Sequence, residues 1–159
     1  MTYRGASSSR EFWPGFTLVE IMVVVVIIGL LAAIAIPTIA RIRRSAQNSR
    51  FANDLRTFAQ AYETYAMRNG AWPPNAGNGV VPAGMSGELR DASWQAVNSL
   101  GGRWNWDYQF NGVTASISTV LPAADDEQMT EIDSKIDDGD LATGSFQKVN
   151  GRYCYILQK

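Results

Sequence analysis

The chain has 159 residues, a formal net charge of −1 and no histidine, so its length suits one membrane helix followed by one small domain. The absence of histidine excludes His-based catalytic triads and His-ligated metals. The lone Cys154 excludes an intrachain disulfide, and we expect it to be a buried strand residue rather than a reactive thiol. No nucleophile and base stand at a recognisable spacing, so we expect no enzyme active site.

Residues 1–15 form a polar leader that ends in Gly15, and an uninterrupted apolar run follows at residues 21–36. Counted from Phe16 to Ile36, the apolar segment has 21 residues. A helix of about 20 residues spans the roughly 30 Å hydrocarbon core of a bilayer. A conventional secretory signal places its apolar region before the cleavage point. Here the apolar region follows Gly15, so cleavage there would leave it in the mature chain.

Glu20 and Pro37 are the two anomalies of this segment. A carboxylate within a membrane span is costly and usually functional, and no Lys or Arg in the run can pair with Glu20. A Glu20 side chain that snorkels to the headgroups is the alternative. Pro37 lacks an N–H and clashes with the preceding turn, which predicts a kink or local melting. Its alternative is a simple end to the membrane helix.

The run Gly15-Phe16-Thr17-Leu18-Val19-Glu20, with Pro37 further on, resembles the N-terminus of type IV pilins and type II secretion pseudopilins, the class III signal-peptide family. The resemblance implies cleavage by prepilin peptidase between Gly15 and Phe16, and N-methylation of Phe16. It also implies that Glu20 of one subunit neutralises the new amine of the next during assembly. The implied domains are the leader (1–15), a transmembrane or filament-core helix (16–40) and a periplasmic pilin-like domain (41–159).

Residues 41–69 are predicted to continue the helix with an amphipathic half. Its apolar residues follow one another at intervals of 4, 3, 4 and 3 positions, which places them on one face of the helix. This apolar stripe consists of Phe51, Leu55, Phe58, Tyr62 and Tyr65. Four further residues are expected to widen it: Ile42, Ala52, Ala59 and Ala66. Asn69-Gly70 signals the end of the helix. Residues 70–102 are a loop rich in Gly and Pro, within which residues 93–100 are expected to form a short helix.

Two hairpins are predicted within residues 103–159. Aromatic and polar residues alternate over 104–110, Asn111-Gly112 is a favoured two-residue turn, and residues 113–119 alternate in the return strand. The aromatic strand could stack on sugars or nucleic-acid bases, but we expect it to pack on the apolar stripe of the helix. Asn150-Gly151 marks the second hairpin. The expected fold is α+β, a long N-terminal helix packed on a small antiparallel sheet.

The segment between the hairpins is predicted to form a short helix over 122–138, capped by Asp125 and with Met129, Ile132 and Ile136 facing inward. Eight acids face one base between residues 125 and 140, whereas six arginines face two acids between residues 41 and 68. This asymmetry suits packing between subunits or a cation site. Major pseudopilins carry a calcium site in their C-terminal region, so the resemblance suggests calcium here, with these candidate ligands: Asp133, Asp137, Asp138 and Asp140. A solvated acidic turn is the alternative.

The function expected from the resemblance is a structural subunit of a pseudopilus, specifically of type II secretion. A type IV pilin for adhesion or DNA uptake is the alternative within the family, and a membrane-anchored ligand-binding module is the alternative outside it. The implied partners are further copies of the chain, other pilins or pseudopilins, prepilin peptidase, the inner-membrane assembly platform and membrane lipid, but not nucleic acid. Lys and Arg counts flanking the span favour a cytoplasmic C-terminal domain, whereas the resemblance implies a periplasmic one.

Overall fold

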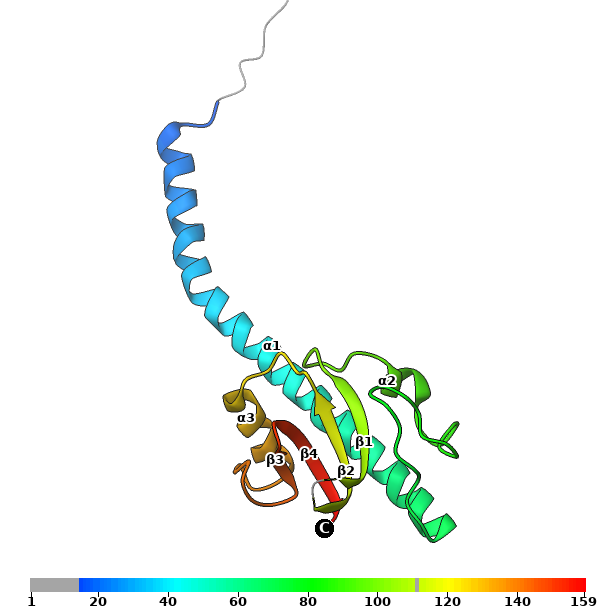
Figure 1. Cartoon of the computed structure of the whole chain (residues 1–159). Helices are drawn as coiled ribbons and strands as arrows, with labels where there is room; N and C mark the ends of the chain where they lie inside the picture. Colours follow the sequence, from blue (N-terminus) through cyan, green and yellow to red (C-terminus); the bar gives the residue numbers. More distant parts are fainter. Residues whose placement is uncertain (1–14, 111) are drawn as a thin grey trace, which may run out of the picture. The chain divides into compact units, whose positions relative to one another are not determined.

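The computed structural model describes residues 15–110 and 112–159, so residues 1–14 of the predicted leader (1–15) and Asn111 lie outside the described residues. The described part divides into two units, up to Ala40 and from Arg41 onward, and each is treated by itself. The elements in chain order are α1 (Leu18–Asn69), α2 (Asp91–Gln95), β1 (Arg103–Phe110), β2 (Val113–Val120), α3 (Asp126–Ile136), β3 (Phe146–Val149) and β4 (Arg152–Gln158). This is the predicted α+β fold (Figure 1).

In the N-terminal unit, α1 begins at Leu18 and presents its apolar side chains outward, with none of the hydrophobic window buried. Among the described residues it is the one helix long and apolar enough to cross a membrane. Helical hydrogen bonding continues past Pro37, where the hydroxyl of Thr38 donates to the carbonyl of Ile34 at 3.0 Å. Pro37 therefore neither ends nor melts the helix, and the predicted kink stays a prediction.

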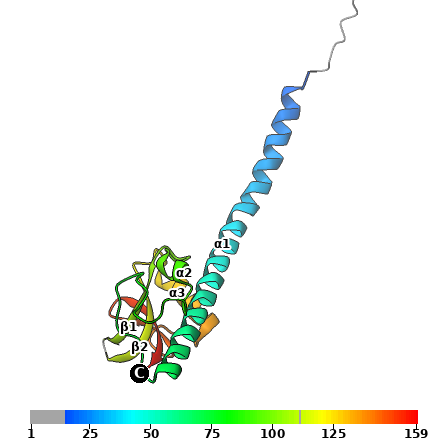
Figure 2. The same ribbon diagram turned by 90° about the vertical axis from the view of Figure 1, so that its right-hand side faces the viewer.

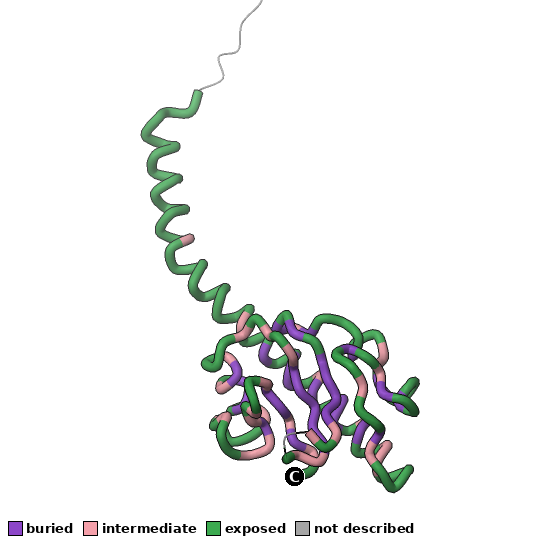
Figure 3. Tube along the Cα trace, in the orientation of Figure 1, coloured by how far each residue is buried: buried purple, intermediate pink, exposed green. Residues whose placement is uncertain are grey.

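In the C-terminal unit, residues 41–69 of α1 lie along one face of a four-stranded antiparallel sheet (Figures 1 and 2). The strand order is β1-β2-β4-β3, and the first hairpin pairs Trp106 with Ile117. The next strand pair places Ile117 opposite Tyr155. Burial in Figure 3 is concentrated in the central strands and in the part of α1 that faces them.

The core is aromatic and joins α1 to the first strand, as the sequence predicted. The Phe51 ring stacks on Trp104 with 4.7 Å between centroids, and the Tyr62 ring stacks on Trp106 at 4.0 Å. Phe58 meets Trp104 edge to face at 5.2 Å. Trp104 and Trp106 are buried in this contact, so they are not open to sugars or bases. Ile42 does not widen the stripe as expected, because its side chain is exposed.

Two polar residues of β1, Asn105 and Asp107, are buried as well. Asp107 accepts hydrogen bonds from the amide of Asn105 at 2.8 Å and from the hydroxyl of Ser118. The guanidinium of Arg152 lies 3.3 Å from the same carboxylate and above the ring of Phe110. Buried polar groups need such partners, and this network supplies them on the sheet face opposite α1.

The connection after α1 begins as predicted and then departs from the prediction. Gly70 takes a φ of +70°, and its N–H donates to the carbonyl of Ala66 at 2.8 Å, which ends the helix with a left-handed cap. The short helix lies at Asp91–Gln95, not at 93–100. The reason is Asn98, whose side-chain oxygen accepts from the N–H groups of Leu100 and Gly102 at 3.0 Å each. Such local side-chain bonds compete with helix formation.

The two hairpins and α3 agree with the prediction. Asn150 and Gly151 both have positive φ, 48° and 78°, as a favoured two-residue turn requires. Asp125 caps α3 by accepting from the N–H of Gln128 at 2.8 Å. The side chain of Gln128 does not return to the cap residue as in a full capping box; it reaches the side chain of Asn48 on α1.

Candidate functional site

The start of α1 is closed by a capping box made of Thr17 and Glu20. The N–H of Glu20 donates to the Thr17 hydroxyl oxygen at 3.2 Å, and the N–H of Thr17 donates to the Glu20 carboxylate at 3.3 Å. The Thr17 hydroxyl also donates to this carboxylate at 3.4 Å. The Thr-x-x-Glu spacing at residues 17–20 is the sequence signal of such a box.

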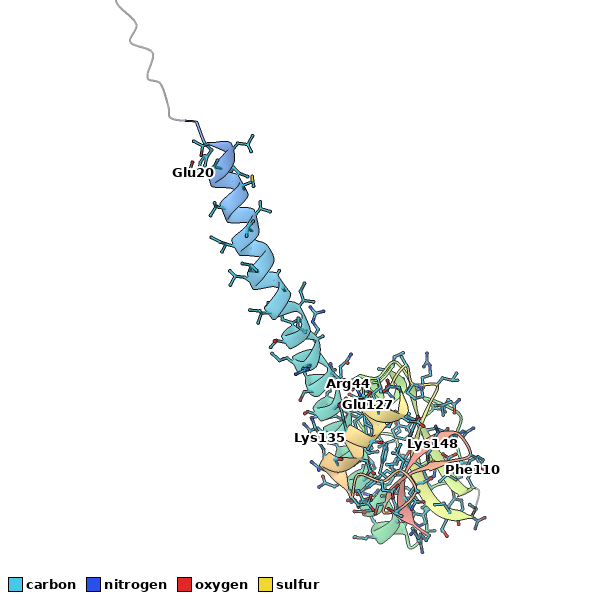
Figure 4. The ribbon with its side chains drawn as sticks, turned by 90° about the vertical axis from the view of Figure 1, so that its left-hand side faces the viewer. Glu20, Arg44, Phe110, Glu127, Lys135 and Lys148 are labelled. Atoms are coloured by element: carbon cyan, nitrogen blue, oxygen red, sulfur yellow. The ribbon has the colours of Figure 1, made fainter. Side chains whose placement is uncertain are left out.

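The box gives Glu20 polar neighbours but does not neutralise it. Residues 15–40 contain no Lys or Arg, so the described N-terminal unit offers no side-chain cation. The partial positive charge of a helix N-terminus favours a carboxylate there, and the capping bonds reduce its desolvation cost. A full opposite charge would have to come from another group. Figure 4 labels Glu20 at the beginning of α1.

Gly15 and Phe16 precede the cap and are exposed. A Cβ built on Gly15 would meet no heavy atom of the described residues within 4 Å, and its φ is not in the left-handed region. Neither crowding nor backbone conformation within the chain therefore calls for glycine at this position. A binding cleft that admits only a bare backbone would call for it.

In the acidic turn, the structure brings together three of the four predicted ligands. Carboxylate oxygens of Asp133, Asp137 and Asp138 all lie within 4.8 Å of one another. Asp133 on α3 is completely buried, and neither of its oxygens has a hydrogen-bond partner among the described residues. Asp140 stands apart from this group, and its carboxylate accepts from the N–H of Ala142 at 3.0 Å.

The other two carboxylates of the group are fixed by the loop. Asp137 accepts from the N–H of Ser145 and from that of Phe146, the latter at 3.2 Å. Asp138 accepts from the N–H of Asp140 at 2.9 Å and from the hydroxyl of Thr143 at 2.7 Å. The backbone passes so close that a Cβ on Gly144 would collide with the carboxylate of Asp137.

The pKa values of Asp133 and Asp138 are shifted in opposite directions. Burial, aided by the neighbouring carboxylates of Asp138 and Asp137, raises the pKa of Asp133 to about 6. The hydrogen bonds from the Asp140 N–H and the Thr143 hydroxyl lower the pKa of Asp138. The nearby N–H of Gly139 opposes the rise at Asp133 only in part, and a buried carboxylate with so little compensation is stabilised by a proton or by a cation. The Asp133 carboxylate, together with the carboxylates of Asp137 and Asp138, is therefore a set of oxygen ligands that fits a hard cation such as calcium.

Basic and polar side chains of α1 contact acidic and polar groups of α3 in a seam that sequence reasoning missed. Part of the opposite charge of the two segments is therefore paired within the chain. The Arg44 Nε lies 3.1 Å from the carboxylate of Glu131, which also accepts from the buried Asn48 amide at 2.7 Å. Further along, the Arg56 guanidinium donates to the last-turn carbonyl of Lys135 at 2.7 Å. Figure 4 labels Arg44 near α3. The charge blocks that suggested contacts between subunits thus partly satisfy one another within one subunit.

Cys154 lies buried in β4, as predicted. Burial, with a smaller contribution from the Asp107 carboxylate, raises the pKa of its thiol to about 12. The thiolate is the reactive form of cysteine, so this thiol is inert at neutral pH.

Comparison with known proteins points to the segment that carries Glu20. The model of a family described as "Prokaryotic N-terminal methylation motif" matches residues 15–36. The type II secretion system core protein G of Pseudomonas aeruginosa is 42% identical over 64 residues, which are 40% of this chain and 45% of that protein. The core protein G of Vibrio cholerae is 36% identical over 59 residues, 37% of this chain and 40% of that protein.

A pilin is similar over a longer stretch. The type IV major pilin protein PilE1 of Neisseria gonorrhoeae is 34% identical over 86 residues, 54% of this chain and 38% of that protein. The chain thus spans less than half the length of each of these relatives. No solved structure gives a significant match. The resemblance drawn from Gly15 to Glu20 is confirmed: the chain carries the prokaryotic N-terminal methylation motif at residues 15–36, and it is similar to type II secretion core protein G and to a type IV pilin.

Proposed function

We propose that this chain is a structural subunit of a type II secretion pseudopilus, which assembles through its N-terminal helix and has no catalytic role. The observation that carries the proposal is the methylation motif at residues 15–36, with an unneutralised Glu20 at the capped start of an exposed apolar helix. Prepilin peptidase would cut between Gly15 and Phe16, and the new amine of Phe16 would be methylated.

The C-terminal unit supports assembly through helices rather than through sheet edges. Unpaired edge strands are the usual route to strand-by-strand polymerisation. Along β1, the N–H of Gly79 donates to the Trp104 carbonyl at 2.7 Å, and the Asn75 side chain bonds both backbone groups of Tyr108. Along β3, the N–H of Lys148 donates to the carbonyl of Leu141 at 2.8 Å. These contacts occupy hydrogen-bonding groups along both edge strands, β1 and β3. The exposed apolar half of α1 is then the surface whose burial would stabilise an assembly most.

In this proposal the Glu20 carboxylate pairs with the Phe16 amine of a neighbouring subunit. That amine exists only after cleavage, so the charge pair would tie assembly to processing. The pair would form in a low-dielectric helix bundle, where an opposite charge is strongly favoured over none. The partners would be further copies of the chain, other pseudopilins, the peptidase and an inner-membrane assembly platform. The subunit would wait in the bacterial inner membrane as a single-pass protein with its C-terminal domain in the periplasm.

A type IV pilin for adhesion or DNA uptake is the second candidate, favoured by the longer similarity to the gonococcal pilin, which covers 54% of this chain. A membrane-anchored ligand-binding module has less support, because the aromatic side chains Trp104 and Trp106 are buried in the core.

We further propose that Asp133, Asp137 and Asp138 hold one calcium ion, which would supply two positive charges to a cluster of three acids. The buried, unpartnered carboxylate of Asp133 supports this assignment. At a calcium concentration a hundredfold above its Kd, binding would stabilise the fold by about 2.7 kcal/mol. Thermal melting of the full chain in calcium and in chelator tests the site, and equal melting temperatures would refute it.

The assembly proposal is tested with Glu20→Ala. We expect the variant to insert into membranes and to be cleaved, but to enter filaments at least about tenfold less than the wild type, since removing Glu20 would leave the neighbour's buried amine unpaired, at a cost of about 3–5 kcal/mol. Glu63→Ala, which removes an exposed acid from the other half of α1, is the matched control and should assemble normally. Normal filament yield from Glu20→Ala would show that this carboxylate is not the assembly device.

A further inference from the structure

Leu121 is an exposed leucine in an unfavourable backbone conformation. It directly follows β2, its side chain is 86% exposed, and its φ is +52°. The left-handed region of backbone conformation is disfavoured for a leucine. Because the side chain is exposed, no hydrophobic burial compensates for this cost. Backbone strain that persists at an exposed position often marks a contact site. Folding of the chain alone therefore does not account for this residue.

The neighbours of Leu121 combine apolar surface with positive charge. Val97, 57% exposed, lies beside it, and the two line a recess of about 150 Å³ together with Gly101, Arg103 and Val120. Arg103 pairs with Val120 at the end of the β1–β2 ladder, and its side chain is exposed. We call the surface formed by Val97, Arg103 and Leu121 the Leu121 face.

The Leu121 face lies at the end of the C-terminal unit where residues 41–48 of α1 begin. The hydroxyl of Ser99, in the loop beside Val97, donates to the carbonyl of Gln47 at 3.0 Å. In Figure 1 the arrowhead of β2, which Leu121 follows, points to this end of the unit. Arg41 and Arg43 are exposed there, and neither makes an ion pair with any described residue.

The short connection to the apolar run limits how far Arg41 can lie from a membrane that the run spans. Arg41 follows Ile36 by five residues. Five residues span about 7.5 Å as a helix and no more than about 18 Å fully extended. The headgroup region adds roughly 5–8 Å to each side of the hydrocarbon core. If residues 18–36 span a bilayer, Arg41 and Arg43 therefore come within reach of the headgroups, and the Leu121 face lies at the same end of the C-terminal unit.

We propose that, in the membrane-inserted subunit, the Leu121 face docks on an anionic bilayer surface. Leu121 and Val97 enter the interfacial region, and Arg41, Arg43 and Arg103 contact lipid phosphates. Basic side chains beside aliphatic ones are the combination that binds anionic bilayers. The positive-inside rule places arginines on the cytoplasmic side of a membrane span, so it does not explain Arg41 and Arg43 if the C-terminal domain is periplasmic. Contact with lipid phosphates would explain them. The proposal rests on the membrane anchoring proposed above.

The test uses the full chain in phosphatidylcholine vesicles with and without phosphatidylglycerol. Ala123→Cys places an exposed label site two residues from Leu121, and the buried Cys154 stays unlabelled. A polarity-sensitive dye at this site should shift to the blue and be quenched by headgroup-labelled lipid, more strongly with phosphatidylglycerol. Leu121→Asn in this background should reduce the quenching severalfold, and because Asn tolerates left-handed backbone the variant should fold. Replacing Arg41 and Arg43 together by Gln should remove the dependence on phosphatidylglycerol.

The matched control is Met67→Asn, which removes an equally prominent apolar side chain, 84% exposed, near the other end of the helix and should leave the quenching unchanged. A chain that floats with vesicles but shows no lipid quenching at Ala123→Cys overturns the docking and leaves membrane anchoring intact. A chain that does not float with vesicles overturns both. A dye shift that grows with the protein-to-lipid ratio and ignores phosphatidylglycerol means that a second copy covers the face, and also overturns the proposal.

Discussion

Asp133→Asn should change the stability of the protein in opposite directions with and without calcium. In the folded chain the pKa of Asp133 is raised from 3.8 to about 6, which corresponds to about 3 kcal/mol. A carboxyl group with a raised pKa contributes its stability below pH 3.8 and loses it as the pH rises through 6. At pH 7.5 in chelator the ionised, unpartnered Asp133 therefore destabilises the wild type. Asn removes that charge, and after a cost of about 1–2 kcal/mol for burying an amide the net gain is about 1–2 kcal/mol.

The assay is thermal unfolding of the full chain in detergent, followed by near-ultraviolet circular dichroism of the buried tryptophans. One kcal/mol corresponds to about 2–4 °C for a protein of this size, so Asp133→Asn should melt several degrees above the wild type in chelator at pH 7.5. The difference should vanish near pH 4, where Asp133 is protonated. In calcium the difference in melting temperature between Asp133→Asn and the wild type should become smaller or change sign, because only the wild type is stabilised by the ion.

Asp140→Asn is the matched control, since it removes a charge from the same turn but not from the group of three carboxylates. It should keep the calcium shift of the wild type. An Asp133→Asn variant that melts with the wild type in chelator at every pH would refute the electrostatic reasoning. One that retains the full calcium shift would remove Asp133 from the metal site.

Three further predictions concern the C-terminal unit. Tyr62→Phe keeps the stack on Trp106 and removes a buried hydroxyl that has no partner, so it should raise stability by about 1 kcal/mol in thermal melts, whereas Tyr65→Phe should have little effect. Asn48→Ala should lower stability by about 1–3 kcal/mol in the same melts, because it leaves buried hydrogen-bond groups of the α1–α3 seam unpaired. Cys154, whose burial raises its pKa to about 12, should resist maleimide at pH 7 in the folded chain and react on unfolding; labelling of the native protein would contradict its burial.

The parts of the fold that depend on neighbouring residues could be predicted from the sequence. The spacing of Phe51, Phe58 and Tyr62 identified a helix face, and an aromatic strand of matching character made their contact the expected core. Asn150-Gly151 fixed a hairpin, because few residues accept two successive positive φ angles. The cap of α3 at Asp125 was likewise readable from neighbouring residues.

What the sequence did not disclose depends on proximity between distant residues. Arg44 and Asn48 each lie more than 80 positions from Glu131 along the chain, and only the packing of α3 on α1 brings them together as a seam. Spacing alone could not separate Asp140 from the other three acids of the turn, because the loop geometry decides which carboxylates converge. The capping box of Thr17 and Glu20, by contrast, has a local signal in the Thr-x-x-Glu spacing, although the prediction treated Glu20 as a charge in a membrane-length run.

Mass spectrometry of the membrane-extracted protein from bacteria with an active prepilin peptidase tests the central proposal most directly. A subunit that assembles through Glu20 and a neighbour's amine requires that amine to exist, so the mature chain should begin at Phe16 and carry an N-terminal methyl group. A Gly15→Leu variant, which should fold unchanged because Gly15 has no close neighbours, should remain uncut. A wild-type chain that retains Met1 in such cells would contradict the account.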